Sequence, residues 1–110
     1  MDDLALTQVE TVTLAAVADR PRYGYELVQR IAELTDGRIS IRPGNLYRVL
    51  HRLEERGLVS ELAAAGAGFD PRRRYFTATA AGRRAAAVEL VMYSRVLQRT
   101  QVLVEDVGGA

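Results

Sequence analysis

Apolar side chains recur at intervals of three and four residues in several segments of the chain, and this spacing predicts helices. The first predicted helix covers residues 7–18. Thr7 and Glu10 stand at the spacing of a capping box, in which each side chain bonds the other's backbone N–H, and Pro21 limits the other end. The second predicted helix covers residues 24–35 and is closed by an Asp-Gly turn.

A third amphipathic segment begins at Pro43, which suits the first turn of a helix because an N–H has no partner there. Gly57 is the expected stop of this helix. Its apolar face has i, i+3, i+4, i+7 spacing and consists of Leu46, Val49, Leu50 and Leu53.

Three other segments have the pattern of strands. The alternation at residues 39–41 predicts a very short strand. Residues 58–62 and about 73–78 predict two strands that pair as a hairpin, with a long flexible tip over residues 63–71.

Thr79 is the expected N-cap of a single long helix that continues to about residue 104. Such a helix is roughly 38 Å long, at 1.5 Å per residue, and is apolar over more than one narrow stripe. A chain of 110 residues has little other protein to cover it, so we expect this helix, with help from the first predicted helix, to form a homodimer interface. The residues predicted at this interface are Val88, Val91, Met92, Val96, Leu97 and Val102.

Three helices followed by a two-stranded hairpin is the order of a winged helix-turn-helix, with the hairpin as the wing. The predicted fold class is therefore mainly α with a small β-hairpin wing and a long C-terminal helix. We expect a winged helix-turn-helix DNA-binding domain over residues 1–78 and a C-terminal dimerisation helix over residues 79–110.

The composition excludes several kinds of site. The chain has no cysteine and a single histidine, His51, which excludes a disulfide, a thiolate metal site and a histidine-rich metal centre. It has no nucleophile elbow, P-loop or dinucleotide motif, so we predict neither an enzyme nor a cofactor. Apolar runs are shorter than the roughly 20 residues that span a bilayer, and the N-terminus is acidic, which predicts a cytoplasmic protein without a membrane partner.

The net charge of +1 is unevenly distributed. Residues 1–37 contain three arginines and seven acidic residues, whereas residues 38–84 contain ten arginines and four acidic residues. A basic centre in an otherwise neutral chain indicates a surface that attracts an anionic partner.

The third predicted helix carries part of this basic centre. Arg48, Arg52 and Arg56 follow each other at i, i+4 spacing and form a stripe away from the apolar face. Asn45 stands at the head of the stripe. Such a helix fits the major groove of DNA, where Arg can bond guanine and Asn can bond adenine. The alternative is a solvated face on which the arginines pair with the glutamates at 54–55.

A second basic cluster, Arg72, Arg73 and Arg74, lies at the base of the return strand. Alternation along a strand separates Arg73 from the other two, so the three are not expected to face one partner. The wing of a winged helix lies along the DNA backbone or in the minor groove, which suits arginine. The alternative is a solvated cluster that balances Glu61 and Asp70.

Arg83 and Arg84 open the last helix, where positive charge opposes the helix dipole. A DNA phosphate, a carboxylate of a partner chain or solvent screening would each offset this cost, and the sequence leaves these readings open.

Five motifs in unbroken order resemble the PadR-like family of transcriptional regulators over about residues 7–84. The smaller branch of that family, with one long helix after the wing, is the more similar. The motifs are YGYEL at 23–27, GNLY at 44–47, LHRLEERGLV at 50–59, RRYF at 73–76 and TAAG at 79–82.

The resemblance implies a winged-helix homodimer that binds palindromic double-stranded operator DNA, usually as a repressor, and is often released by a small-molecule effector. It also suggests that the phenol of Tyr47 reaches a phosphate, where the alternative is a ring packed at the edge of the core. Tyr25 stands at the start of the second predicted helix, where the alternatives are packing in the core and a phosphate contact. The residues predicted to contact DNA are Tyr25, Arg42, Asn45, Tyr47, Arg48, Arg52, Arg72, Arg73 and Arg74.

The chain departs from the family pattern at Asn45, where Thr or Ser is more usual, and at Arg48, where Pro is common. It also has no tryptophan, which puts a pocket for stacking flat aromatic ligands in doubt. A different function class, a winged-helix protein–protein adaptor that binds no DNA, is the alternative to a regulator. A ligand pocket between the last helices would be compatible with DNA binding.

Overall fold

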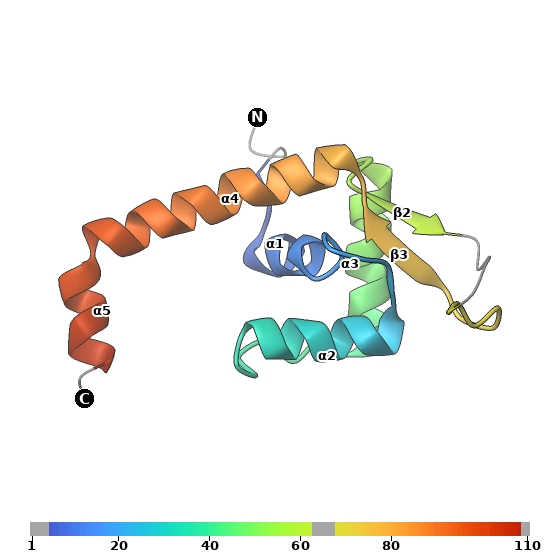
Figure 1. Ribbon diagram of the computed structural model, residues 1–110, viewed down its shortest axis with the longest axis horizontal. Coiled ribbons are helices and arrows are strands. Elements are labelled where there is room, and N and C mark those ends of the chain that lie inside the picture. The colour runs from blue at the N-terminus through green and yellow to red at the C-terminus, as the bar shows by residue number, and fades with distance from the viewer. Residues whose placement is uncertain (1–4, 63–67, 109–110) are drawn as a thin grey trace.

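The computed structural model describes residues 5–62 and 68–108 of the chain. Three helices and a small sheet form one body, and a long helix runs out from it to a short last helix at its far end (Figure 1). The elements are α1 (Gln8–Ala15), β1 (Arg22–Tyr23), α2 (Gly24–Leu34), α3 (Pro43–Glu55), β2 (Val59–Leu62), β3 (Tyr75–Ala78), α4 (Ala80–Arg99) and α5 (Gln101–Gly108). In the described part of the chain, no helix combines the length and apolar content needed to cross a membrane.

Helix α1 begins with the predicted capping box. The Thr7 hydroxyl accepts a hydrogen bond from the Glu10 N–H at 3.1 Å, and the Glu10 carboxylate accepts one from the Thr7 N–H at 2.8 Å. The helix ends at Ala15 rather than at residue 18, because the next carbonyls are used elsewhere. The Ala16 carbonyl accepts from the buried Arg22 guanidinium at 2.6 Å, and the Val17 carbonyl accepts from the N–H of Ala78.

The sheet has three antiparallel strands in the order β1-β3-β2. Its edge strand β1 was not predicted, and the strand predicted at residues 39–41 is wrong. The Ile39 N–H donates to the Thr35 hydroxyl at 3.1 Å and is therefore satisfied locally. Ile39 and Ile41 are both half-buried against the core, so this segment is an extended connection between α2 and α3.

Helices α2 and α3 form the helix-turn-helix. Leu34 is 43% exposed because it is the last residue of α2. The α3 helix matches its prediction: it begins at Pro43, and Gly57 follows it with a φ of +73°. The innermost side chains come from the helices, the sheet and the turn after α1, and they are Leu14, Val17, Leu27, Ile31, Leu46, Leu50, Leu53 and Phe76.

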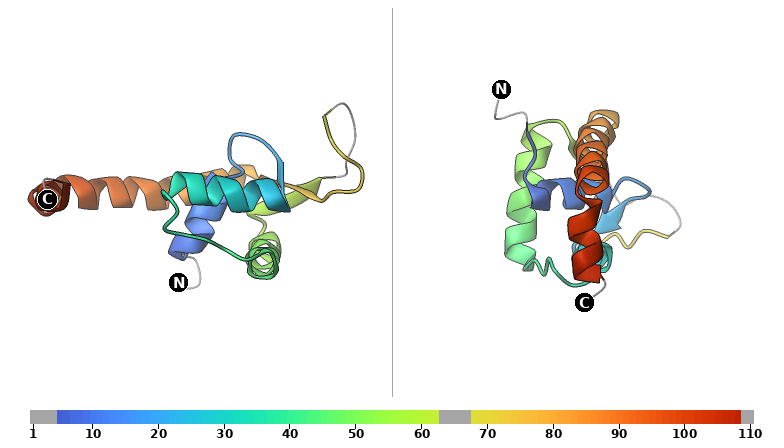
Figure 2. Two further views of the ribbon diagram at one scale, coloured as in Figure 1. Left: turned by 90° about the horizontal axis from the view of Figure 1, so that it is seen from below. Right: turned by 90° about the vertical axis from the view of Figure 1, so that its left-hand side faces the viewer.

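The wing is the β2–β3 hairpin. Its strands occupy Val59–Leu62 and Tyr75–Ala78, so the return strand begins two residues later than predicted. Tyr75 and Phe76 are buried. The predicted flexible tip falls partly on residues 63–67, which lie outside the described residues. The wing and α5 lie at opposite ends of the molecule (Figure 2).

Helix α4 begins at the predicted N-cap, where the Thr79 hydroxyl accepts from the Gly82 N–H at 3.0 Å. The prediction of one continuous helix to residue 104 is wrong, because α4 ends at Arg99 and α5 starts at Gln101. Thr100 lies between them, and its hydroxyl donates to the Val96 carbonyl at 2.6 Å. Such back-bonding by threonine competes with the helical ladder and bends helices.

Candidate DNA-binding surface

The exposed side of α3 is the centre of the predicted surface. Leu46, Val49, Leu50 and Leu53 are buried, so the opposite side of this helix faces solvent. Asn45 and Arg48 lie in the first half of α3 and are exposed. Arg48 makes no ion pair or hydrogen bond with the part of the chain that the structure describes. A guanidinium presented in this way can bind a guanine edge or a phosphate.

The arginine stripe does not stay on one face. Four residues advance a helix by about 400°, so each i, i+4 step turns the stripe by about 40°. Arg48 therefore faces outward, while Arg52 and Arg56 turn toward α1 and meet Glu10, which is only 6% exposed. The Arg52 Nε lies 3.6 Å from one Glu10 oxygen, and the Arg56 Nη1 lies 4.0 Å from the other.

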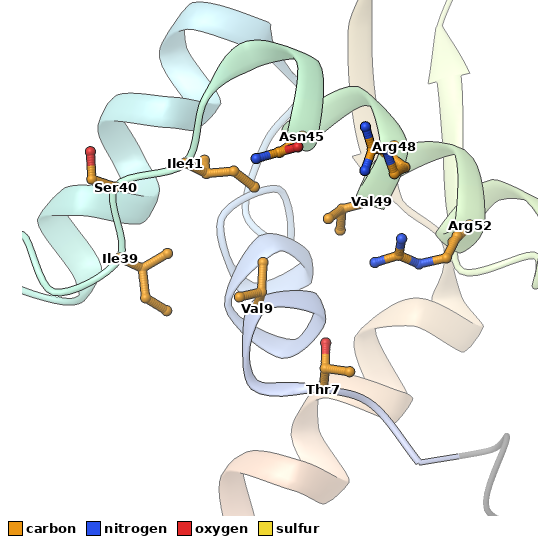
Figure 3. A pocket seen from close by; sticks show the side chains of 9 residues that line it. All are labelled: Thr7, Val9, Ile39, Ser40, Ile41, Asn45, Arg48, Val49 and Arg52. Atoms are coloured by element: carbon orange, nitrogen blue, oxygen red, sulfur yellow. The ribbon is translucent and has the colours of Figure 1, made fainter.

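This arrangement divides the predicted stripe into two parts. The carboxylate of Glu10 holds Arg52 and Arg56 on the flank of α3, and Arg48 remains on its outer side. Asn45, Arg48 and Arg52 together line one side of a cavity between α3 and the start of α1 (Figure 3). The nearby His51 is exposed, with Nε2 3.8 Å from a carboxylate oxygen of Glu55.

Tyr47 occupies the other flank of α3, between the start of α2 and the wing. Its ring packs edge-to-face on Phe76 with centroids 6.1 Å apart, and it is 36% exposed. A Cβ at Gly24 would lie 2.7 Å from the Tyr47 hydroxyl oxygen, so a glycine at that position gives the phenol its space. The ring of Tyr47 is therefore packed at the edge of the core, and a phosphate contact from its hydroxyl stays a prediction.

Arg72 and Arg73 share one carboxylate. Arg72 donates to both oxygens of Asp70, at 3.1 and 3.0 Å, and Arg73 Nε lies 3.3 Å from the same group. These hydrogen bonds, with Arg72 the main cause, hold the pKa of Asp70 well below its usual range. The expected separation of Arg73 from Arg72 is wrong, because both precede β3 and lie in a turn, where strand alternation does not apply.

Arg74 pairs across the hairpin with Glu61 of β2. Its Nη2 and Nε lie 2.8 and 3.0 Å from the two carboxylate oxygens, and this pairing lowers the pKa of Glu61. The Arg74 guanidinium carbon is also 5.3 Å from the centroid of the Tyr47 ring. Exposed pairs of this kind contribute about 0–1 kcal/mol, so a phosphate can replace the carboxylate at little cost.

The remaining predicted contacts lie on the borders of this surface. Tyr25 is 60% exposed at the start of α2, and its hydroxyl accepts from the Gln29 amide at 3.1 Å. Arg42 is exposed at the position before α3. Arg83 has a partner that was not among the expected ones, because its Nε donates to the Ala18 carbonyl at 3.0 Å. Arg84 is exposed.

Three contacts at this surface were missed by reasoning from the sequence. Glu10 was assigned only to a helix cap, and its contacts with Arg52 and Arg56 depend on the packing of α1 against α3. The Arg73 guanidinium carbon lies 4.1 Å from the centroid of the Tyr23 ring, which requires the pairing of β1 with β3. No local signal in the sequence marks any of these three contacts.

A helix-turn-helix followed by a β-hairpin, with the hairpin joined to a third short strand, defines a winged-helix protein. The profile of the family described as "Transcriptional regulator PadR-like family" matches residues 13–88, and the chain belongs to this family of transcriptional regulators. The resemblance noted in the sequence is thereby confirmed. The family is a regulatory one and not a family of enzymes.

Several known proteins are similar to this chain. A relative from Lysinibacillus sphaericus described as "Uncharacterized protein X" is 27% identical over 81 residues, which are 74% of this chain and 73% of the relative. The crystal structure of a PadR-like transcriptional regulator from Bacillus cereus has a TM-score of 0.73 at 20% identity, covering 88% of this chain and 91% of that one. A PadR family regulator from Clostridium difficile R20291 also has a TM-score of 0.73, at 16% identity, covering 89% and 99%. These two structures share the fold of this chain.

Proposed function

We propose that the chain is a homodimer that binds palindromic double-stranded operator DNA in the cytoplasm and represses transcription until a small-molecule effector releases it. The observation that carries the DNA-binding part is Arg48, an exposed guanidinium in the first half of α3 with no partner among the described residues. Asn45 lies one turn before it on the exposed side of the same helix.

In this proposal, α3 enters the major groove with its N-terminal end first, as recognition helices do. Arg48 and Asn45 read base edges there, and Arg42, Tyr47 and Arg52 contact the backbone around them. The wing arginines Arg72, Arg73 and Arg74, with Tyr25 at the start of α2, supply further phosphate contacts. A repressor of this kind acts by occupying DNA that the transcription machinery needs.

The experiment that tests this proposal compares single-base operator variants in a competition assay with wild type and Arg48→Ala. The variant is expected to lose about 1–3 kcal/mol on the operator and to relax preference at one base pair in each half-site. Affinity for random DNA should change much less. Because a two-fold dimer reads the operator, the two relaxed positions should be related by the operator's dyad.

Arg56→Ala is the matched control, since Arg56 is the same residue type two turns further along and on the flank toward α1. It should leave base preference unchanged. If Arg48→Ala instead weakens binding to every variant and to random DNA equally, Arg48 is a phosphate anchor and base reading lies elsewhere.

The proposed dimer interface is the apolar face of α4 and α5. Its predicted members are between 46% and 72% exposed in the single chain: Val88, Val91, Met92, Val96, Leu97 and Val102. Covering such side chains gains about 25 cal/mol per Å² of apolar surface, and a two-fold interface covers the same patch on both chains. A dimer also supplies the two reading helices that a palindromic operator requires.

Val91→Glu is expected to convert the dimer into a monomer at micromolar concentration, because it puts a charge into the centre of the apolar face. Light scattering measures the mass, and circular dichroism checks that the body is still folded. Val91→Ile keeps the face apolar and should remain dimeric. A wild-type protein that is monomeric at micromolar concentration would contradict the proposed interface.

A further inference from the structure

A cavity of about 490 Å³ lies between the start of α1, the connection that follows α2, and α3. Its apolar part consists of Val9, Ile39, Ile41 and Val49, and Figure 3 shows Val9, Ile39 and Ile41 pointing into the same space. The α3 side of the cavity carries the polar side chains of Asn45, Arg48 and Arg52. The volume is in the range of about 300–1,000 Å³ that small-molecule sites occupy.

The charge at this cavity is positive. Arg48 has no partner among the described residues, and the single carboxylate of Glu10 contacts both Arg52 and Arg56. Arg48 therefore lacks a described counter-charge and Arg52 shares its carboxylate, so an anion is favoured beside Arg48 and Arg52. A carboxylate suits this position because a guanidinium can donate two parallel N–H···O bonds to it.

The apolar part of the cavity indicates what the anion is attached to. Its four apolar side chains are all branched aliphatic, and none of the nine described residues that line it is aromatic. A flat aromatic ligand would find no ring on which to stack, whereas a flexible alkyl chain can pack against Val9, Ile39 and Ile41.

We propose that this cavity binds a medium-chain aliphatic carboxylate, with the carboxylate on Arg48 and Arg52 and the alkyl chain against Ile39, Ile41 and Val9. The bound acid competes with DNA, because it occupies side chains that the operator would use. The binding part of this proposal needs no DNA, and the competition part rests on the proposed function.

The acid and the operator compete because both would bind the same guanidinium groups. A guanidinium that donates two hydrogen bonds to the acid has turned away from the groove, so acid and operator weaken each other by the same factor. Couplings of this kind typically amount to about 5- to 150-fold. Octanoate at saturation is therefore expected to raise the Kd for the operator within that range.

Isoleucine methyl groups make the binding part directly testable. The chain has three isoleucines, of which Ile39 and Ile41 line the cavity and Ile31 is fully buried in the core. Methyl-labelled full-length protein is titrated with octanoate and, separately, with 1-octanol. Octanoate should shift the Ile39 and Ile41 signals saturably and leave Ile31 nearly unchanged, and the uncharged alcohol should bind at least tenfold more weakly.

Variants check the charged contact. Arg48→Ala should weaken octanoate binding about tenfold or more, and Arg84→Ala, an exposed arginine outside the cavity lining, should leave it unchanged. Equal binding of acid and alcohol, equal binding by Arg48→Ala, or no shift at millimolar octanoate would each overturn the site. A shift of the Met92 methyl signal without the isoleucines would also overturn it, since the acid would then bind at the last helices.

An operator titration with and without octanoate separates the two parts. A raised operator Kd supports competition, and an unchanged Kd with shifted isoleucines overturns competition while the site stands. If octanoate shifts Ile39 and Ile41 but the protein binds no DNA, the proposed function fails and the acid site stands.

Discussion

Operator affinity is expected to fall by roughly 10³–10⁵-fold when salt rises from about 50 to about 200 mM, if about six to ten phosphates are contacted per dimer. The reason is that each neutralised phosphate releases condensed counterions, and added salt opposes that release. Residues 38–84, which hold ten of the fifteen arginines, supply the cations. Fluorescence anisotropy at several salt concentrations measures the slope of log K against log salt.

The contribution of the wing to this slope can be measured with variants of the ion pair between Arg74 and Glu61. Arg74→Ala is expected to weaken binding to all sequences alike and to reduce the slope by about one for each phosphate lost. Glu61→Gln should act in the opposite direction, because it frees the guanidinium that Glu61 now holds at 2.8 Å. If neither variant changes affinity or slope, the wing does not touch DNA, and α3 carries the electrostatic contact without it.

The parts of the fold that follow local rules could be predicted from the sequence. The caps at Thr7 and Thr79 and the stop at Gly57 each depend on residues within four positions, and all three are present. The strand predicted at residues 39–41 does not form, because an alternating pattern does not by itself provide a strand with which to pair. One edge of β3 pairs instead with Arg22–Tyr23, a two-residue strand that is too short to show an alternating pattern.

The candidate site shows the same limit. The apolar face of α3 fixed its exposed side, so Asn45 and Arg48 could be placed on the surface from the sequence alone. The different surroundings of Arg48 and Arg52 could not be predicted, because they depend on Glu10, which reaches α3 only after α1 has packed against it. Sequence spacing describes positions on a helix, and a contact partner on another helix is a property of the packed fold.

Gly82→Ala is expected to cause a large loss of stability. The first turn of α4 lies directly on Leu58, the residue before β2, whose carbonyl also accepts the Thr79 N–H at 3.0 Å. A Cβ at Gly82 would collide with that carbonyl oxygen, 2.9 Å from its carbon and 3.2 Å from Leu14 Cδ2. Backbone has to move, so we expect a cost of about 3 kcal/mol or more and a fall in Tm of more than about 10 °C.

Gly44→Ala is the matched control, since Gly44 lies in the first turn of α3 and a Cβ there would meet nothing within 4 Å. It should be neutral or stabilise by up to about 1 kcal/mol, because alanine loses less backbone freedom in a helix. Thermal unfolding of both variants at one protein concentration separates the effect of the steric clash on Tm from the effect of helix propensity. A Gly82→Ala protein with the Tm of the wild type would mean that α4 does not lie this close to Leu58.

The contact between Gly82 and Leu58 also sets the direction in which α4 leaves the body, and that direction determines where a second α3 would lie in the proposed dimer. A variant that folds with α4 displaced should therefore keep its affinity for a single half-site and lose the preference for two half-sites at the operator's spacing.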